Sequence, residues 1–200
     1  MSTRAGRGFV LVVIALGVAG CATGLEVGYP ESDANRALLA SVPSRRVEMR
    51  TVTDRRIDTA RVAVDRDGKD VVTARPVGDI LAEALAIELA KNGHVVGAPG
   101  EVVLAADVED VWLDMVRGHG RTQYVGKIVF TLTALDGRTG EQVMARRYIG
   151  TSRRRVEKPS DDAAREVLNA ALARSIRDVA TDPAMVAAFS RATAAAAPAR

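Results

Sequence analysis

The feature that most constrains the fold is a set of three long segments in which apolar and polar residues alternate. They cover residues 102–116, 122–135 and 142–156, and the last two are joined by the turn signal Asp136–Gly140. Alternation with a period of two is typical of a strand with one buried face. Long strands joined by short loops predict an antiparallel meander. On its first strand, the residues expected on one face are Leu104, Ala106, Val108 and Trp112.

Two segments with helical spacing predict the layer that covers this sheet. One begins after Pro76 and stops at Asn92-Gly93, and the other opens at Ser160, whose hydroxyl can cap free N–H groups. A short helix is expected after Asp182-Pro183. Shorter extended stretches are expected at residues 47–52, 57–64, 71–73 and 94–96. The fold class predicted is α+β, with a mainly antiparallel sheet and two principal helices packed on one face.

The first twenty residues have the pattern of a secretory signal. Arg4 and Arg7 give a positive start, and an uncharged apolar run extends from Phe9 to Leu16. Small residues then lead to Cys21, the single cysteine of the chain, which excludes an intrachain disulfide framework. The apolar run is too short for a transmembrane helix, which needs about 20 residues. The pattern predicts a cleaved signal peptide, and a plain signal or an uncleaved anchor is the alternative.

The residues around the cysteine add a second indication. Val18-Ala19-Gly20-Cys21 resembles the lipobox of bacterial lipoproteins. The resemblance implies that the thiol of Cys21 receives a diacylglycerol, that the chain is cut before it, and that its new amine is acylated. Two or three acyl chains anchor a protein durably, at about 0.8 kcal/mol per buried CH₂. Ala22 and Thr23 stand where an Asp would retain an enterobacterial lipoprotein at the inner membrane, which indicates the outer membrane and its periplasmic face.

Four parts of the chain are predicted from these patterns. Residues 1–20 form the cleaved lipoprotein signal peptide, and residues 21–44 form a lipidated, flexible tether rich in Gly, Pro and polar residues. Within the tether, the short stretch Asn35–Ser41 has residues that can form a helical turn or pack on the domain. Residues 45–191 form the periplasmic α+β domain, and residues 192–200 form a disordered, alanine-rich tail.

The order and spacing of these elements resemble the YajG-like family of proteobacterial outer-membrane lipoproteins. The resemblance covers most of residues 21–191. It rests on the lipobox cysteine and on the segments PVGDIL, KNGHVVG and IRDVATDP, the last followed by Phe189. The family carries no established activity and no catalytic residues. The resemblance therefore implies a role for Cys21 alone, as the lipidation site.

No constellation in the sequence predicts catalysis, a cofactor or a metal site. A Gly-X-Ser-X-Gly nucleophile motif is absent, and His94 and His119 are expected to be packed or exposed side chains rather than a ligand pair. The carboxylates of the first long strand are expected to be solvated, with Asp107 and Glu109 pointing one way and Asp110 the other. We therefore expect a protein that is not an enzyme and has no cofactor.

Arginines are concentrated on the last long strand, as Arg146, Arg147, Arg153, Arg154 and Arg155. Arginine pairs with phosphate and carboxylate groups through two parallel hydrogen bonds, so one interpretation is an anion-binding patch. The alternative is a solvated edge on which charge discourages sheet-to-sheet aggregation. The whole chain does not favour nucleic acid as a partner, because its 28 basic residues nearly balance 25 acidic ones.

The function expected is that of a membrane-anchored periplasmic lipoprotein with a non-catalytic binding or scaffolding role in cell-envelope maintenance or assembly. The alternative is a binding module for an anionic envelope ligand, lipopolysaccharide or peptidoglycan, that uses the arginine-rich strand. The partners expected are the membrane, through the lipid anchor, and an envelope protein or one of these two polymers.

Overall fold

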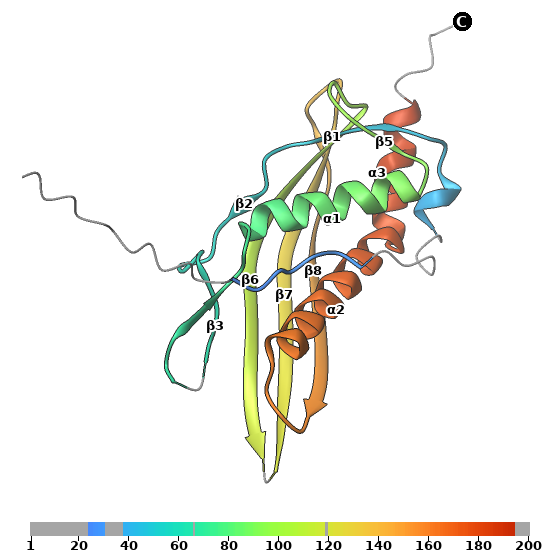
Figure 1. Ribbon diagram of the computed structural model, residues 1–200. Coiled ribbons are helices and arrows are strands. Elements are labelled where there is room, and N and C mark those ends of the chain that lie inside the picture. The colour runs from blue at the N-terminus through green and yellow to red at the C-terminus, as the bar shows by residue number, and fades with distance from the viewer. Residues whose placement is uncertain (1–23, 31–37, 66, 119, 195–200) are drawn as a thin grey trace, which may run out of the picture.

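A single mixed sheet is the framework of the molecule (Figure 1). The computed structural model describes residues 24–30, 38–65, 67–118 and 120–194. The strands β6 (Val102–Gly118), β7 (Arg121–Asp136) and β8 (Gln142–Val156) pair antiparallel along nearly their whole length. The predicted meander is confirmed. The turn between β7 and β8 closes through Asp136, whose carboxylate accepts from the N–H groups of Arg138 and Thr139.

The other end of the sheet contains short parallel strands. β1 (Arg46–Met49) lies between β5 (Val95–Val96) and β6 and runs parallel to both, and β2 (Thr53–Asp54) pairs parallel with β6. Parallel neighbours need a long crossover connection, which here includes the first helix. β3 (Arg61–Val64) and β4 (Asp70–Val72) form a separate hairpin, so the extended stretch expected from residue 57 begins four residues later.

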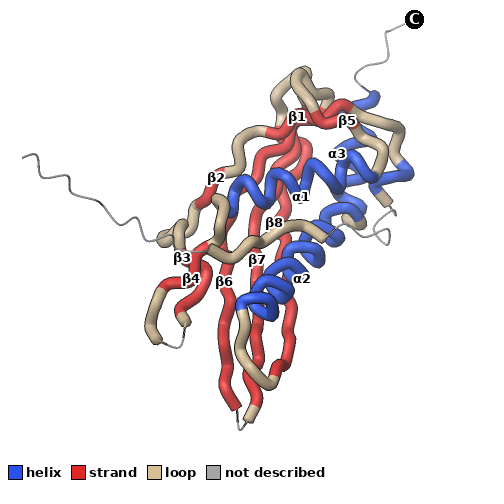
Figure 2. Tube along the Cα trace, viewed as in Figure 1, coloured by secondary structure: helices blue, strands red, loops and turns tan. Residues whose placement is uncertain are grey.

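The helices lie on one side of the sheet, as predicted (Figure 2). α1 (Val77–Lys91) and α2 (Asp161–Ala180) cross in front of the strands, and α3 (Pro183–Ala194) continues beyond α2 beside β8. The hydroxyl of Ser160 accepts from the N–H of Ala163, which confirms the predicted start of α2. The largest side chains buried between the layers are Leu39, Leu81, Leu85, Leu104, Phe130, Leu132, Leu168, Leu172, Ile176, Met185 and Phe189.

Two glycines let α2 approach the sheet closely. A Cβ atom at Gly150 on β8 would lie 1.9 Å from the carbonyl oxygen of Ala171, and one at Gly126 on β7 would lie 2.8 Å from Cγ1 of Val167. Real Cβ atoms do not come that near to other atoms, so any side chain here would displace the helix. The two glycines therefore fix the distance between α2 and the β7–β8 pair.

A bulge at Glu109 changes the faces of β6. Val108 pairs with Phe130 but the next pair is Asp110 with Val129, so Glu109 is an extra residue and the alternation reverses after it. Val111 and Leu113 are buried beyond the bulge. The prediction that Trp112 shares a face with Val108 is therefore wrong, because Trp112 pairs with Lys127.

Part of the expected tether is packed on the domain. Leu25 and Val27 are buried, and Leu25 pairs with the end of β4 through its N–H to Val72 (2.8 Å) and its carbonyl to the N–H of Ala74 (2.9 Å). A 3₁₀ turn at Leu39–Ser41 buries Leu39, in agreement with the expectation for that stretch. The prediction of a flexible tether over residues 21–44 is therefore wrong for these segments. Their apolar residues are too few to show a periodicity in the sequence.

The C-terminal end of the domain also differs from expectation. α3 continues to Ala194, so the disordered tail expected from residue 192 does not begin there. Residues 195–200 lie outside the described residues, as do the signal peptide expected over residues 1–20 and the stretch 31–37.

Candidate functional site

The predicted lipidation site, Cys21, lies outside the described residues, but its distance from the domain is limited by chain length. Gly24 opens the described chain, and Leu25 already belongs to the core. A chain spans at most about 3.6 Å per residue. A lipid on Cys21 would therefore be held within about 14 Å of the core at Leu25, about half the 25–30 Å reach that a flexible tether of 23 residues would have.

The segment Gly24–Pro30 bridges the two large helices. The N–H of Gly28 donates to Oδ1 of Asn169 on α2 (3.0 Å), and the hydroxyl of Tyr29 donates to Oε2 of Glu88 on α1 (2.6 Å). Glu88 is only 2% exposed and also accepts from the side chain of Asn92 (2.9 Å). Sequence reasoning missed this contact because Tyr29 falls in the expected tether.

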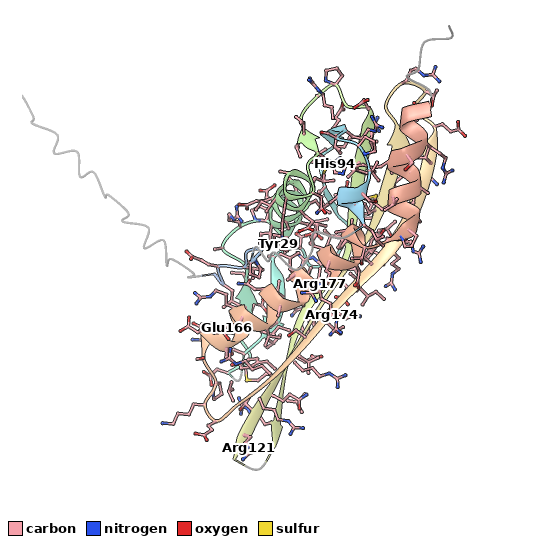
Figure 3. All side chains as sticks on the ribbon, turned by 90° about the vertical axis from the view of Figure 1, so that its right-hand side faces the viewer. Tyr29, His94, Arg121, Glu166, Arg174 and Arg177 are labelled. Atoms are coloured by element: carbon pink, nitrogen blue, oxygen red, sulfur yellow. The ribbon has the colours of Figure 1, made fainter. Side chains whose placement is uncertain are left out.

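The five arginines of the predicted patch are not on one surface, because neighbouring side chains of a strand point to opposite faces. Arg146 and Arg154 lie on the helix side, where Arg146 pairs with Asp182 (3.2 Å) and Arg154 pairs with Glu166 of α2. Figure 3 labels Glu166 near the end of α2 that lies beside this part of β8. These two arginines are therefore engaged in holding the helical layer to the sheet.

The remaining arginines of the set occupy odd positions and lie on the face away from the helices. Arg147 donates to Oε2 of Glu109 (2.6 Å), and Thr131 donates to the other oxygen of Glu109 (2.6 Å). These two hydrogen bonds hold the pKa of Glu109 below its usual value. Arg153 and Arg155 lie on this face as well, so three of the five arginines share one face of the strand. Of these three, Arg147 forms an ion pair with a carboxylate.

The carboxylates of β6 are paired rather than simply solvated. Asp107 binds Arg55 (2.9 Å) and Asp110 binds Lys127 (2.8 Å). Because of the bulge, Asp110 lies on the same face as Asp107 and Glu109, which corrects the expectation that it points the other way. The pairs leave these acidic groups with cationic partners, an arrangement that fits a structural role better than acid–base chemistry.

Asp182 joins the start of α3 to the sheet. It is 6% exposed, and its carboxylate accepts from the hydroxyl of Tyr148 (2.8 Å), from Arg146, and from the N–H of Ala184 (2.8 Å). Burial, and then the neighbouring carboxylate, raise the pKa of Tyr148. The phenol therefore stays protonated and remains a donor to Asp182.

His94 is a packed side chain, as expected. It is 3% exposed; its Nδ1 accepts from the N–H of Arg45 (3.2 Å), and its Nε2 lies 3.3 Å from the carbonyl oxygen of Leu39. Its ring meets Phe189 of α3 edge-on at 4.8 Å. Burial holds the pKa of His94 below its usual value, so the imidazole is neutral near pH 7. His119 lies outside the described residues.

Two of the hollows beside α2 are large. One, of about 520 Å³, lies beside the Gly24–Pro30 segment and is lined by Arg75, Arg165 and Asn169 among others, and the other, of about 600 Å³, lies between β8 and α2. Within the described part of the chain, no three His, Cys, Asp or Glu side chains come together in a way that could hold a metal ion. No helix among residues 24–194, gaps excepted, has the length and apolar character to cross a bilayer.

The similarity to known proteins agrees with this architecture. A family model described as uncharacterized lipoprotein matches residues 41–189. No curated protein matches the chain. Among solved structures, protein XCC0632 from Xanthomonas campestris is similar at 16% identity and a TM-score of 0.56, over 82% of this chain and 93% of that one. At that identity the likeness shows the fold alone.

A second similar structure is the minor lipoprotein from Acinetobacter baumannii, at 12% identity and a TM-score of 0.39, over 70% of this chain and 92% of that one. The family match covers the six-stranded sheet, α1 and α2 and ends within α3, and it agrees with the resemblance found in the sequence. A lipoprotein is held at a membrane by its lipid. The chain therefore belongs to the YajG-like family of uncharacterized lipoproteins.

Proposed function

We propose that this protein is a non-catalytic binding or scaffolding lipoprotein, anchored through acylated Cys21 to the outer membrane with its domain in the periplasm, where it acts in envelope maintenance or assembly. The observation that carries the proposal is the packing of Leu25 and Val27, which joins the anchored end of the chain directly to the core. A domain held this near its anchor is suited to presenting a surface at the membrane.

The state of the ionisable side chains supports a binding role over catalysis. Catalytic acids and bases need a pKa near the working pH and access to a substrate. Here the pKa of Glu109 is lowered by donors that hold it charged, and His94 is enclosed between Leu39 and Phe189. Asp182 accepts hydrogen bonds from three groups within the fold. These residues stabilise the domain, and its surface is left to do the binding.

Fractionation of cells that make the full chain tests the anchor. The Cys21→Ser variant should leave the membrane fraction or accumulate as precursor, and should lose labelling by radioactive palmitate. Thr23→Ser, a small change two residues after the cysteine, should behave as wild type. Labelling that survives in Cys21→Ser contradicts the proposed anchor.

The assignment to the outer membrane rests on Ala22 and Thr23 and is tested by adding the retention signal. Ala22→Asp should move the protein to the inner-membrane fraction of a density gradient, whereas Ala22→Asn should leave it in the outer-membrane fraction. Wild-type protein found in the inner-membrane fraction would refute this part of the proposal.

The scaffolding role predicts a protein neighbour. Cross-linking in intact cells, followed by mass spectrometry of the captured adducts, should yield an envelope protein joined to the domain. If no protein is captured while purified lipopolysaccharide or peptidoglycan binds tightly, the alternative of an anionic envelope ligand replaces scaffolding. The observation that favours this alternative is Arg153, which has no carboxylate partner among the described residues.

A further inference from the structure

A basic groove lies between α2 and the last strand of the sheet. Its volume is about 600 Å³. The residues that line it come from both elements and are Thr151, Ser152, Arg153, Ala170, Arg174 and Arg177. β8 ends the strand order of the described sheet, so this side of the strand is not covered by another described strand. The groove is thus an open site at the edge of β8, lined by three arginines and two hydroxyl-bearing residues.

The helix sets the direction of two of the arginines. Residues three apart lie on the same face of a helix, so Arg174 and Arg177 both face the groove. Figure 3 labels them next to one another on α2. Nη1 of Arg174 lies 3.5 Å from the carbonyl oxygen of Thr151, a contact that directs this guanidinium toward the edge of β8. Arg153 belongs to the other face of β8 and lines the groove at the open edge of this strand.

The groove contains two arginines, Arg153 and Arg174, whose charge its own lining does not balance. No carboxylate is among the lining residues. Arg146, Arg147 and Arg154 each have a carboxylate partner, whereas no described carboxylate lies within ion-pair distance of Arg153 or Arg174. Cations gathered in a concave surface concentrate positive potential there and attract anions.

The groove also lies near the anchored end of the chain. Gly24 and Arg165 line a common hollow, and Arg174 is nine residues further along α2, about 14 Å at 1.5 Å per residue. Gly24 is itself three residues from Cys21. If Cys21 is anchored in a membrane, the groove is therefore near enough to that membrane to meet the anionic headgroups at its surface.

We infer that the groove between β8 and α2 binds a phosphate group, with Arg153, Arg174 and Arg177 as its ligands. Guanidinium groups match phosphate oxygens in pairs, and the hydroxyl of Ser152, on the helix side of β8, supplies a further donor. The volume exceeds what a bare phosphate ion needs and falls in the usual range for small-molecule sites, about 300–1,000 Å³. The inference deepens the proposed binding role and rests on it, by naming the chemistry that the domain recognises.

Calorimetric titration of the full chain, purified in a nonionic detergent, tests the site with three probes: inorganic phosphate, glycerol 3-phosphate and dihexanoyl phosphatidylglycerol. One saturable site is expected. Binding of phosphatidylglycerol at least tenfold tighter than of the other two identifies a lipid headgroup as the source, and similar affinities identify a free phosphate group. Either pattern supports the inference, and no saturable binding of any probe overturns it.

A set of variants distinguishes binding in the groove from a general attraction of anions to the positive charge of the protein. R174Q/R177Q should weaken binding about tenfold or more for each guanidinium lost, because hydrogen bonds to charged groups are the strong ones. R138Q/R191Q removes the same charge from exposed positions outside the groove and should bind as wild type. Arg153→Gln should also weaken binding, and it tests the groove from the strand in case the double substitution disturbs α2.

Two results of this comparison contradict the inference. One is binding unchanged in both R174Q/R177Q and Arg153→Gln, and the other is an equal loss in R138Q/R191Q. Circular dichroism of each variant establishes that the fold is kept. Failure here leaves membrane anchoring through Cys21 intact, whereas failure of the fractionation test leaves phosphate binding measurable in the detached chain, so the two proposals fail separately.

Discussion

The close approach of α2 to β8 at Gly150 gives a specific prediction about stability. In Gly150→Ala, the new Cβ atom would lie 1.9 Å from the carbonyl oxygen of Ala171, where ordinary contacts begin near 3.4 Å. The clash is with backbone atoms of the helix, so no side-chain rotation relieves it. α2 must move by about 1.5 Å or the strand must bend, and either change loosens the packing of the core.

The expected loss follows from that displacement. Overpacking a tight site costs about 1–3 kcal/mol, and a clash with helix backbone falls at the upper end. Replacing Gly by Ala returns about 0.4–1 kcal/mol by restricting the unfolded chain. The free energy of unfolding should therefore fall by about 2 kcal/mol, which lowers Tm by about 4–8 °C for a protein of this size.

Urea unfolding followed by circular dichroism measures this loss. The matched control is Gly97→Ala, because nothing lies within 4 Å of a Cβ atom there and its φ is not positive. The control should leave the free energy of unfolding within about 0.5 kcal/mol of wild type. A Gly150→Ala protein as stable as the Gly97→Ala protein would refute the close seating of α2.

Three further changes test other contacts. Tyr148→Phe removes a donor to the buried Asp182 and should cost about 1–3 kcal/mol in urea unfolding; an unchanged midpoint would mean that the carboxylate is satisfied without the phenol. The pKa of His94 is lowered in the fold, so the unfolded chain binds a proton at this residue before the folded chain does as the pH falls. The free energy of unfolding should therefore be full above pH 6.5 and fall as the pH drops below it. This pH dependence, measured between pH 7.5 and 5.5, should vanish in His94→Gln, and it would persist if another group caused it. Leu25→Ala should cost about 2–3 kcal/mol whereas Leu38→Ala, at an exposed position, should cost less than about 0.5 kcal/mol, and equal effects would show that the N-terminal segment does not contribute to the core.

The regular elements were predictable because their signals are local. Alternation over more than a dozen residues defined β6, β7 and β8, and Pro76 with Asn92-Gly93 bounded α1, where Gly93 has the positive φ (+88°) that favours glycine. Such patterns repeat many times within one element, so a single exception does not obscure them.

The features that were missed depend on contacts far along the chain. The bulge at Glu109 has no signature of its own, yet it reverses every side chain after it. Leu25 and Val27 are too few to show a period, and their burial depends on β4 and α2, which come later in the sequence. Nor does a short strand such as β1 carry a local signal for parallel pairing with β6.

The five arginines of the predicted patch are divided between two faces of β8 for a different reason. The period of two that identified β8 also places Arg146 and Arg147 on opposite faces, so the separation was available in the sequence. The groove could not be predicted from the sequence, because Arg174 and Arg177 lie on α2 and come near Arg153 only through the packing of the helix on the strand.

The pairing of Leu25 with β4 also determines how the domain bears mechanical load. Any pull from a lipid on Cys21 reaches the fold first at the two backbone hydrogen bonds of Leu25, to Val72 and Ala74. If the segment Gly24–Pro30 were pulled away from the domain, the free chain from residue 21 would grow to at least 10 residues, with a mean span of at least about 16 Å. This contact therefore limits the distance between a lipid on Cys21 and the domain. Single-molecule pulling can measure the force that breaks it.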